Sequence, residues 1–433
     1  MSGKFLVAAG TSALAVVGAG LFYYNNQKQL KKKLSESSGK ILSDSEFIEA
    51  LKTVKLSEKT IKIVKATAPV VGEHAVEITS AFYPLMFKNN PEALYYFNKA
   101  NQNKGMQQEA LAHAVVAYAS NIDNLEAVVP LLKVIAERHC ALSVTADLYA
   151  IVYKNLMLAI AKVLADALTP EIVDAWSEAV VFLSKACIDT EAGLYKTLEA
   201  RSGGWKGERK FVLKSKVKVA DDTVQFEFVP TTGEEGIAFT AGQYLTIRCP
   251  NLSPRHYTIT SASGSKSLMC TTRLVSGGEV STYMHKQLKV GDEVLLGAPC
   301  GLFSPEEGES ISLISAGIGI TPMYSFLKAV DSKSVKSILH FETSDKRMAF
   351  KTEFTEAKAN IVYTEGKDRK TLIQENAKRI VSKSGSECTY YLCGPKEFMS
   401  EMTKALKSNG AKNINSEVFG TGTAPVVHCP MSL

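Results

Sequence analysis

Seven consecutive residues near the middle of the chain place a cation, an aromatic ring and hydroxyl groups on one predicted β-strand, Arg255-His256-Tyr257-Thr258-Ile259-Thr260-Ser261. An arginine can hold a phosphate through two parallel hydrogen bonds. Tyr257 can pack against a flat ring, and the Thr258 hydroxyl can reach that ring's edge. Downstream, Gly277-Gly278-Glu279-Val280-Ser281-Thr282 predicts a turn that opens a short helix, whose free N–H groups suit a phosphate. Either segment alone is compatible with an ordinary strand or turn, but together they predict a flavin site. Its expected residues are Tyr244, Arg255, His256, Tyr257, Thr258, Gly277, Gly278, Val280, Ser281 and Thr282.

A second glycine-containing turn, Gly317-Ile318-Gly319-Ile320-Thr321-Pro322, follows a predicted strand and opens a predicted helix. The two glycines permit a tight turn and close approach of a phosphate, and Pro322 stands where a helix's first turn accepts proline. Proline replaces the third glycine of the usual dinucleotide fingerprint. A later strand ends in Cys393-Gly394-Pro395, and the two motifs together predict that a nicotinamide nucleotide, NAD(P)H, binds beside the flavin.

In the first half, His139 ends an otherwise apolar helical stripe of Leu131, Leu132 and Ile135. A lone histidine there is more often a core or surface residue than a metal ligand. A second helical stripe contains one carboxylate, Glu191, which must be paired if it is buried: Trp176, Val180, Leu183, Cys187, Glu191, Leu194 and Leu198. Tyr149 stands at the start of another predicted helix, and its hydroxyl could form a hydrogen bond with Glu191. A His–Tyr–Glu chain is what a metal-bound imidazole needs to fix its tautomer and raise its basicity.

Polar groups above apolar walls indicate where a gas ligand could bind. Gln107, Leu111 and Val115 follow each other at intervals of four, so a hydrogen-bonding side chain caps an apolar wall, as in a haem pocket. Tyr83 lies in an otherwise apolar helix. Taken alone, Tyr83 is equally compatible with a core aromatic residue whose hydroxyl reaches the surface.

Length and composition limit the number of domains and the kinds of partner that this chain can have. A chain of 433 residues is expected to form about three domains, and a hydrophobic share of 45% allows real cores. Six lysines and one glutamate in residues 1–40 carry +5 of the net charge of +6, so a diffuse basic surface for nucleic acid is not expected. The eight cysteines contain no CxxC pair, which argues against zinc and disulfide frameworks and suits a reducing compartment.

The N-terminus differs from the rest. Phe5–Tyr24 is a run of twenty residues without a charge, followed by lysines at positions 28, 31, 32 and 33. Twenty apolar residues can span a bilayer as a helix, and the lysines should stay on the cytoplasmic side. Residues 1–27 are therefore expected to be a transmembrane anchor, with the catalytic domains facing the cytoplasm. The membrane can be mitochondrial or that of another organelle. The alternative is a cleaved signal peptide that ends near Gly18-Ala19-Gly20.

The patterning predicts a multidomain fold. Residues 28–44 read as a linker. Residues 45–200 show the three-and-four spacing of an all-α domain. Residues 205–305 alternate in short strands, which predicts an antiparallel β-barrel, and residues 308–433 alternate strands and helices, which predicts an α/β domain with a parallel sheet.

With these motifs in place, residues 205–433 resemble the ferredoxin–NADP reductase family, and residues 45–433 resemble the flavohaemoglobins. The matching blocks are Phe82-Tyr83, Asn89-Asn90-Pro91-Glu92, Phe97-Asn98, Asn101-Gln102, Gln107-x-Glu109-Ala110-Leu111, Ala117-Tyr118-Ala119-Ser120-Asn121-Ile122, Arg138-His139, Asp174-Ala175-Trp176 and Gly203-Gly204-Trp205.

The resemblance implies haem b, FAD and NAD(P)H as cofactors, in a globin followed by a flavin module. His139 would be the proximal iron ligand, with Tyr149 and Glu191 as its hydrogen-bonded relay. Tyr83, Gln107 and Leu111 would form the distal pocket, and Phe97 would stack on the porphyrin. An aromatic residue near the C-terminus covers the flavin in this family. The matching segment here is Val418, Phe419, Gly420 and Thr421.

The implied activity is that of a nitric oxide dioxygenase: NAD(P)H reduces FAD, electrons pass to haem, and nitric oxide and dioxygen become nitrate. Two alternatives remain, a reductase of hydroperoxides or quinones and a haem-based sensor of oxygen or nitric oxide. The sequence does not choose NADH over NADPH, and a monomer is expected. Three departures from the family pattern are Thr258 in place of serine, Arg138 in place of lysine, and Pro84 after Tyr83, which can bend the helix and re-aim the phenol.

Overall fold

The computed structural model describes residues 40–97, 105–165, 167–233 and 235–419. The predicted anchor, residues 1–27, and two of the expected flavin contacts, Gly420 and Thr421, lie outside this part of the chain. No helix in the described ranges is both long and apolar enough to cross a membrane. The chain forms two compact units. Of the described residues, one unit contains those within 40–91, 111–126 and 146–186, and the other contains those within 92–110, 127–145 and 187–419.

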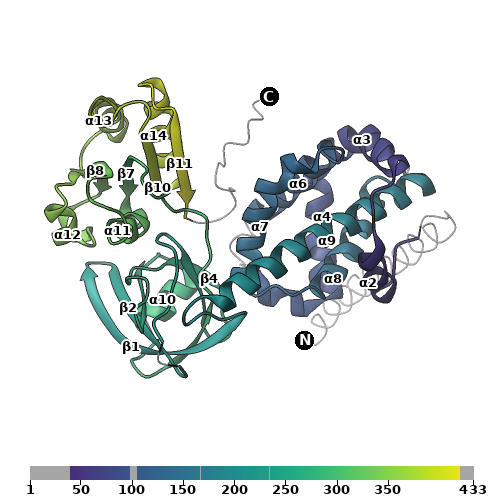
Figure 1. The fold of residues 1–433 in the computed structure, drawn as a ribbon, viewed down its shortest axis with the longest axis horizontal. Coiled ribbons are helices and arrows are strands. Elements are labelled where there is room, and N and C mark those ends of the chain that lie inside the picture. The colour runs from purple at the N-terminus through teal and green to yellow at the C-terminus, as the bar shows by residue number, and fades with distance from the viewer. Residues whose placement is uncertain (1–39, 98–104, 166, 234, 420–433) are drawn as a thin grey trace, which may run out of the picture. The chain divides into compact units, whose positions relative to one another are not determined.

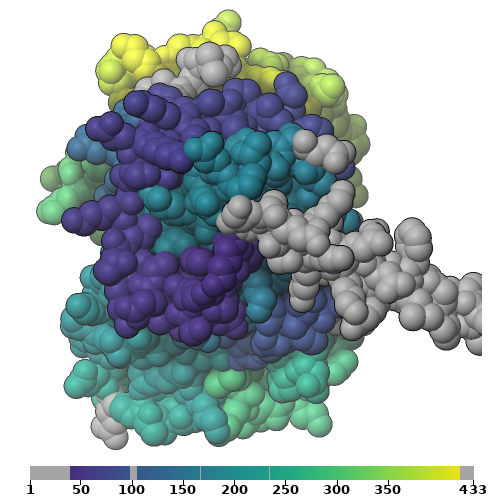
Figure 2. Space-filling model, turned by 90° about the vertical axis from the view of Figure 1, so that its right-hand side faces the viewer, coloured from purple at the N-terminus to yellow at the C-terminus, as the bar shows by residue number. Residues whose placement is uncertain are grey.

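The first unit is helical, as expected for residues 45–200. Its helices are α2 (Asp44–Thr53), α3 (Glu58–Glu73), α4 (Ala75–Asn89), the later part of α6 (Met106–Ser120), α8 (Leu148–Val163) and the first part of α9 (Pro170–Ala200). Ser43 caps α2 in a capping box with Glu46. Lys59 of α3 pairs with Glu171 of α9, and the purple surface of α3 borders the teal surface of α9 (Figure 2).

Pro84 does not interrupt α4, which continues from Ala75 to Asn89. The Pro84 ring is exposed, whereas its neighbours Tyr83 and Leu85 are buried. A proline on the solvent side removes a backbone donor that lies away from the core. Its presence is therefore compatible with a continuous helix.

The second unit adds further helical segments and two lobes. The helical segments are η1 (Pro91–Tyr96) from residue 92, the start of α6, the end of η2 (Leu125–Val128), α7 (Val129–Ala141) and the end of α9. The first lobe is a six-stranded antiparallel sheet in the order β4-β3-β6-β1-β2-β5. Its strands are β1 (Glu208–Ala220), β2 (Thr223–Pro230), β3 (Tyr244–Arg248), β4 (Arg255–Thr258), β5 (Leu268–Arg273) and β6 (Glu293–Gly297), with helix α10 (Glu279–Lys286).

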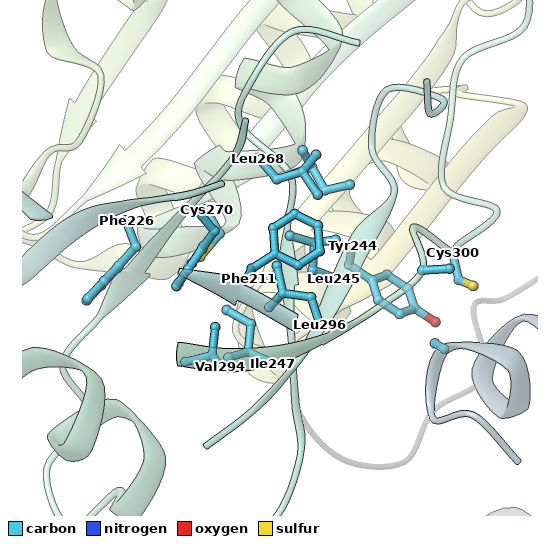
Figure 3. Packing of buried hydrophobic residues seen from close by; sticks show 14 of the residues in the cluster. Phe211, Phe226, Tyr244, Leu245, Ile247, Leu268, Cys270, Val294, Leu296 and Cys300 are labelled. Carbon is cyan, nitrogen blue, oxygen red and sulfur yellow. The ribbon is translucent and has the colours of Figure 1, made fainter. Parts of the chain in front are cut away.

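The sheet closes into the predicted barrel because the chain after β4 changes partner. Residues 255–261 were expected to form one strand, but β4 ends at Thr258. Ile259 then bridges to Cys270 of β5, and Thr260 N–H donates to Met269 O at 2.8 Å. The two edge strands thereby meet around a core that includes Phe211, Phe226 and Leu296 (Figure 3).

The second lobe is the predicted α/β domain, a parallel sheet in the order β11-β10-β7-β8-β9. Its strands are β7 (Ile311–Ala316), β8 (Val335–Glu342), β9 (Asn360–Tyr363), β10 (Thr389–Gly394) and β11 (Asn413–Val418). One face packs on α11 (Ile320–Leu327) and α12 (Lys351–Glu356), the other on α13 (Arg369–Ser384) and α14 (Lys396–Ser408) (Figure 1). From β7 the chain adds β8 and β9 on one side of the sheet, and it then adds β10 and β11 on the other side. The strand order therefore switches between β7 and β10. In open α/β sheets a ligand binds at this point, outside the carboxyl ends of the strands.

A buried histidine in this lobe gives a pH-dependent prediction. His340 of β8 is fully buried beside Ser315, and burial, followed by the charge of Arg273, lowers the pKa of its imidazole to about 3. An unfolded histidine titrates near 6.5, so native stability should fall as the pH drops from about 6.5 towards 3. Between pH 7 and pH 5 the free energy of unfolding of wild type should drop because His340 resists protonation. In His340→Asn this drop should be smaller by about 2 kcal/mol. Urea unfolding at both pH values measures this difference, with His113→Asn on the surface as control. An unchanged pH dependence in His340→Asn would contradict it.

Candidate functional site

The strongest arrangement in the helical half joins α7 and α9. Nδ1 of His139 and Oε1 of Glu191 are 2.7 Å apart, and only 3% of Glu191 is exposed. The prediction that this carboxylate is paired is confirmed. Because the carboxylate accepts from Nδ1–H, it fixes the tautomer in which Nε2 keeps its lone pair for a metal. Tyr149 heads α8 in the first unit, so its place in the relay stays a prediction.

Haem iron suits this imidazole, because the porphyrin brings most of the iron's ligands with it. A haem needs only one axial side chain from the protein. His139, with a carboxylate on its second ring nitrogen, therefore fits haem iron.

The residues expected to line the distal side of the haem lie on three different segments of the chain. Tyr83 of α4 is buried, with its ring against Phe82 and Phe87, and burial raises the pKa of its phenol well above its ordinary value. The phenol therefore keeps its proton at physiological pH and can donate it in a hydrogen bond. Leu111 is half-buried in α6, Gln107 stands at the start of the same helix, and Phe97 follows η1. Their convergence on one pocket stays a prediction, because they are divided between the two units.

The expected flavin residues gather on β3, β4 and the start of α10. Tyr244 pairs with Thr258 across the two strands, and the Tyr244 and His256 rings are stacked with centroids 4.5 Å apart. Arg255 and Tyr257 point to the opposite face, because side chains alternate along a strand. The Arg255 guanidinium is held by the carbonyls of Ser253 and Pro254.

The start of α10 has the properties predicted for a phosphate site. Gly278 is the N-cap and supplies no side-chain cap, so the first N–H groups of the helix remain open to a ligand. Gly277 has a φ of +71°, a conformation that favours glycine, and a Cβ on Gly278 would lie 2.7 Å from Ser281 Oγ and 3.1 Å from Val275 O, so the turn leaves little room there. Val280 and Ser281 are buried in the same turn, next to Thr282.

A hollow of about 600 Å³ opens beside this turn. Its walls include Gly277, Gly278 and Thr282, which were predicted as site residues. Six further lining residues were not: Pro250, Asn251, Leu252, Glu279, Tyr283 and Gln287. The one available signal was Asn251, which adopts a φ of +58°. Asparagine tolerates the left-handed region better than most residues, but the sequence does not show that this loop faces α10.

Helix α7 also contacts the barrel that carries the flavin residues. Gly301 N–H donates to Glu137 Oε2 at 2.7 Å, and the charges of Arg138 and Glu137 both act on Tyr244. Tyr244 lies at the edge of the barrel core, near Cys300 (Figure 3). The helix that bears His139 is therefore hydrogen-bonded to the barrel that carries the expected flavin contacts.

Near the end of the described chain, β11 carries Glu417 and Val418, followed by the exposed Phe419. Burial raises the pKa of Glu417 to about 7, although the nearby charge of Arg138 opposes this effect. Arg138, the arginine that departs from the family pattern, therefore lies close enough for its charge to act on this carboxylate, which precedes Phe419 by two residues.

The two predicted nucleotide motifs meet at the carboxyl edge of the parallel sheet. The turn Gly317–Gly319 joins β7 to α11, and Cys393-Gly394-Pro395 joins the neighbouring β10 to α14. A Cβ on Gly319 would lie 2.4 Å from Cys393 O, so only glycine permits this contact between the turns. Ile320, Thr321 and Pro322 form the buried first turn of α11. A dinucleotide with its pyrophosphate at the α11 N-terminus fits this edge.

The fold and these sites define a class of protein, a globin continuous with a flavin- and nucleotide-binding reductase module. Three family models match the corresponding segments: globin over residues 80–187, oxidoreductase FAD-binding domain over residues 210–304 and oxidoreductase NAD-binding domain over residues 313–404. These matches confirm the three predicted domain types.

Whole-length relatives identify the family. Flavohemoprotein A of Dictyostelium discoideum is 35% identical over 396 residues, which cover 85% of this chain and 99% of that protein. The flavohemoprotein of Bacillus subtilis is 34% identical, with 84% and 98% covered. The crystal structure of a flavohemoglobin from Malassezia yamatoensis, with bound FAD and heme, aligns with a TM-score of 0.72 at 28% identity, covering 84% of this chain and all of that one. The chain belongs to the flavohemoprotein family.

Proposed function

We propose that this protein is a nitric oxide dioxygenase that contains haem b and FAD and takes its electrons from NAD(P)H. When bound, these groups would supply the electron path and the iron at which nitric oxide and dioxygen combine to form nitrate. The observation that carries the proposal is the His139–Glu191 pair in a chain that also has the flavin and nucleotide turns. In this proposal residues 45–200 form the globin domain, 205–305 the flavin domain and 308–433 the nucleotide domain.

Each part of the chain has a role in this proposal. His139 would hold the iron through Nε2, and the negative charge of Glu191 would raise the basicity of the imidazole. Tyr83 would donate from its protonated phenol to the gaseous ligand, together with Gln107, while Leu111 and Phe97 would provide apolar contacts. Tyr149 would complete the relay. Phe419, with its neighbours Val418, Gly420 and Thr421, would cover the flavin.

The assay that tests this function is NAD(P)H-dependent loss of nitric oxide in air, with nitrate as product. Tyr83→Phe removes only a hydroxyl, and one hydrogen bond of about 1.4 kcal/mol predicts a roughly tenfold slower loss. Tyr153→Phe is the matched control, because Tyr153 is also a buried tyrosine of the first unit, with its hydroxyl against Ser177. Equal rates for Tyr83→Phe and wild type would refute the role of Tyr83. Wild type that consumes no nitric oxide would refute the dioxygenase and favour a sensor.

We also propose that residues 1–27 anchor the protein in a membrane, with the catalytic domains on the cytoplasmic side. Support comes from the uncharged run of twenty residues and the lysines that follow it. Removing residues 1–27 should move the protein from the membrane fraction to the supernatant. If the shortened protein still pellets with membranes, the anchor lies elsewhere.

A further inference from the structure

An arginine of the flavin barrel holds the short helical segment η1. Arg248 is the last residue of β3, and 7% of it is exposed. Its Nη1 donates to the carbonyl of Tyr95 at 2.7 Å, and its guanidinium carbon lies 3.5 Å from the centre of the Tyr95 ring. Its Nε lies 2.5 Å from Oε1 of Glu208, the first residue of β1. One buried cation therefore contacts both the barrel and Tyr95, which belong to the same compact unit.

Glu208 joins these contacts into a closed set of three side chains, Tyr95, Arg248 and Glu208, called the Arg248 cluster below. Oε2 of Glu208 accepts a hydrogen bond from the Tyr95 hydroxyl at 2.6 Å. Burial, followed by this hydrogen bond, raises the pKa of the Tyr95 phenol to about 12, so the hydroxyl keeps its proton and remains a donor. A planar guanidinium bound by a carboxylate, a carbonyl and an aromatic face has little freedom to turn. The cluster therefore fixes η1 on the barrel.

Stability alone does not explain an arginine at this position. Nη2 of Arg248 is buried and has no hydrogen-bond partner among the residues that the structure describes, and an unsatisfied buried donor costs free energy. Replacing a buried ion pair by apolar side chains of similar volume is often neutral or stabilising. An apolar residue would therefore hold the barrel to η1 about as firmly. The arginine adds direction, because its hydrogen bond fixes the position of the Tyr95 carbonyl.

This carbonyl lies two residues before Phe97, the expected porphyrin contact. The Phe97 N–H donates to the Leu94 carbonyl at 3.3 Å, so Tyr95 lies within the turn that ends at Phe97. At the other end of β3 stands Tyr244, an expected flavin contact. All five residues of this strand are buried, and it pairs with both β4 and β6. A single strand, hydrogen-bonded on both sides, thereby connects a flavin contact with the turn that carries Phe97.

We propose that Arg248 is a positioning residue that fixes Phe97 relative to the flavin strand. Through Tyr95 it would hold this porphyrin contact at a constant distance from the flavin contact on β3. Glu208 would set the plane of the guanidinium and so the direction of its hydrogen bond. Transfer between two bound groups depends steeply on their relative position. The cluster would therefore serve the electron step from flavin to haem and not the uptake of hydride from NAD(P)H. The inference rests on the proposed haem and flavin sites, but not on the fate of nitric oxide.

Arg209 provides a matched control, because it is a barrel arginine with contacts of the same kinds. It lies on β1, donates from Nη1 to Gly203 O at 3.2 Å, and has its guanidinium carbon 5.6 Å from the centres of the Trp205 and Phe211 rings. These partners lie on the barrel or just before it, and not on η1. Comparing Arg248→Met with Arg209→Met therefore separates the loss of the Arg248 cluster from the loss of any barrel arginine.

The experiment uses the protein loaded with haem and FAD, mixed without air with NADH and carbon monoxide. Stopped-flow absorbance follows flavin reduction, and the carbon monoxide adduct reports haem reduction, so the two steps are measured separately. A displacement of about 1 Å can cost about 100-fold in rate, so Arg248→Met should slow haem reduction about 10- to 100-fold. Its flavin reduction, and both steps in Arg209→Met, should stay within about threefold of wild type. Arg248→Lys should recover part of the haem reduction rate, because lysine keeps the charge beside Glu208.

Amide hydrogen exchange gives a second measurement that does not depend on activity. Loss of the hydrogen bond to the Tyr95 carbonyl makes local opening of this turn easier. The peptide that contains the Phe97 N–H should therefore exchange about tenfold faster in Arg248→Met. A peptide from α14 serves as internal reference and should not change.

Three results would overturn the proposal. Haem reduction at the wild-type rate in Arg248→Met, with unchanged exchange, would show that the cluster positions nothing. Faster exchange without slower haem reduction would show that it only stabilises η1. Equal slowing of both steps, or equal losses in Arg248→Met and Arg209→Met, would show a general effect of altering the barrel. The melting temperature identifies a variant that has lost its fold, for which Arg248→Lys becomes the deciding variant. Nitric oxide takes no part in these measurements, so their failure and failure of the dioxygenase proposal are distinguishable.

Discussion

Gly319→Ala is expected to prevent NAD(P)H from reducing the protein while its haem and flavin absorbance remain. The added Cβ would lie 2.4 Å from Cys393 O and 2.8 Å from Gly394 N. These are backbone atoms of the neighbouring turn, and they can yield only if the two turns separate. A shift of about 1 Å at a site that positions reactants can cost about 100-fold in rate. We therefore expect at least a 100-fold loss in the apparent second-order rate of flavin reduction by NADH.

Stopped-flow absorbance of the flavin checks this result, with dithionite as a reductant that does not use the nucleotide site. The matched control is Gly193→Ala in α9, where a Cβ would meet nothing within 4 Å. Alanine is the better helix former by about 1 kcal/mol, so the control should be neutral or slightly stabilising. Reduction of Gly319→Ala by NADH at the wild-type rate would mean that the nucleotide does not use this turn.

Glu191→Gln is expected to slow nitric oxide consumption by about 10- to 100-fold, the usual effect of removing the partner of a metal-bound histidine. Glutamine fills the same space and can still accept from His139 Nδ1, but it lacks the negative charge. The iron–imidazole bond should weaken, which lowers its stretching frequency in resonance Raman spectra. Carbon monoxide should still bind to the reduced protein, because the distal side is untouched.

Glu199→Gln tests whether any loss of carboxylate from α9 has this effect. Glu199 is exposed two turns further along the same helix, and its replacement should change neither rate nor spectrum. A wild-type rate in Glu191→Gln would show that the charge on the imidazole is not needed. A variant without a Soret band would show instead that the pair is required to retain haem.

The sequence predicted those parts of the site that lie on one element or on elements with a clear period. Glu191 stood out because a carboxylate interrupted an apolar helical stripe, and burial then required a partner. The glycine turns were identifiable because the residues before them read as strands and the residues after them as helices. The three domain types followed from the same change of period along the chain.

Other features depend on distances that sequence spacing does not encode. Asn251 lines the same hollow as the turn before α10, but the sequence does not predict the path of the loop that brings it there. Arg273 and Glu342 are 69 residues apart and come from different lobes, although their side chains form a hydrogen bond. The early end of β4 was missed because Ile259 is as apolar as any strand residue. Only the closure of the sheet shows that the chain changes partner there.

The first described residues are fastened to the helical unit by more than one bond. Leu42 N–H donates to the Tyr153 hydroxyl at 3.2 Å, and that hydroxyl lies 2.6 Å from Ser177 Oγ. Phe47, fully buried in α2, packs its ring against Tyr153. A mechanical load applied to the preceding segment would pass through Tyr153 into α8 and α9. The helical unit would resist such a pull as a whole, and α2 would not peel away first.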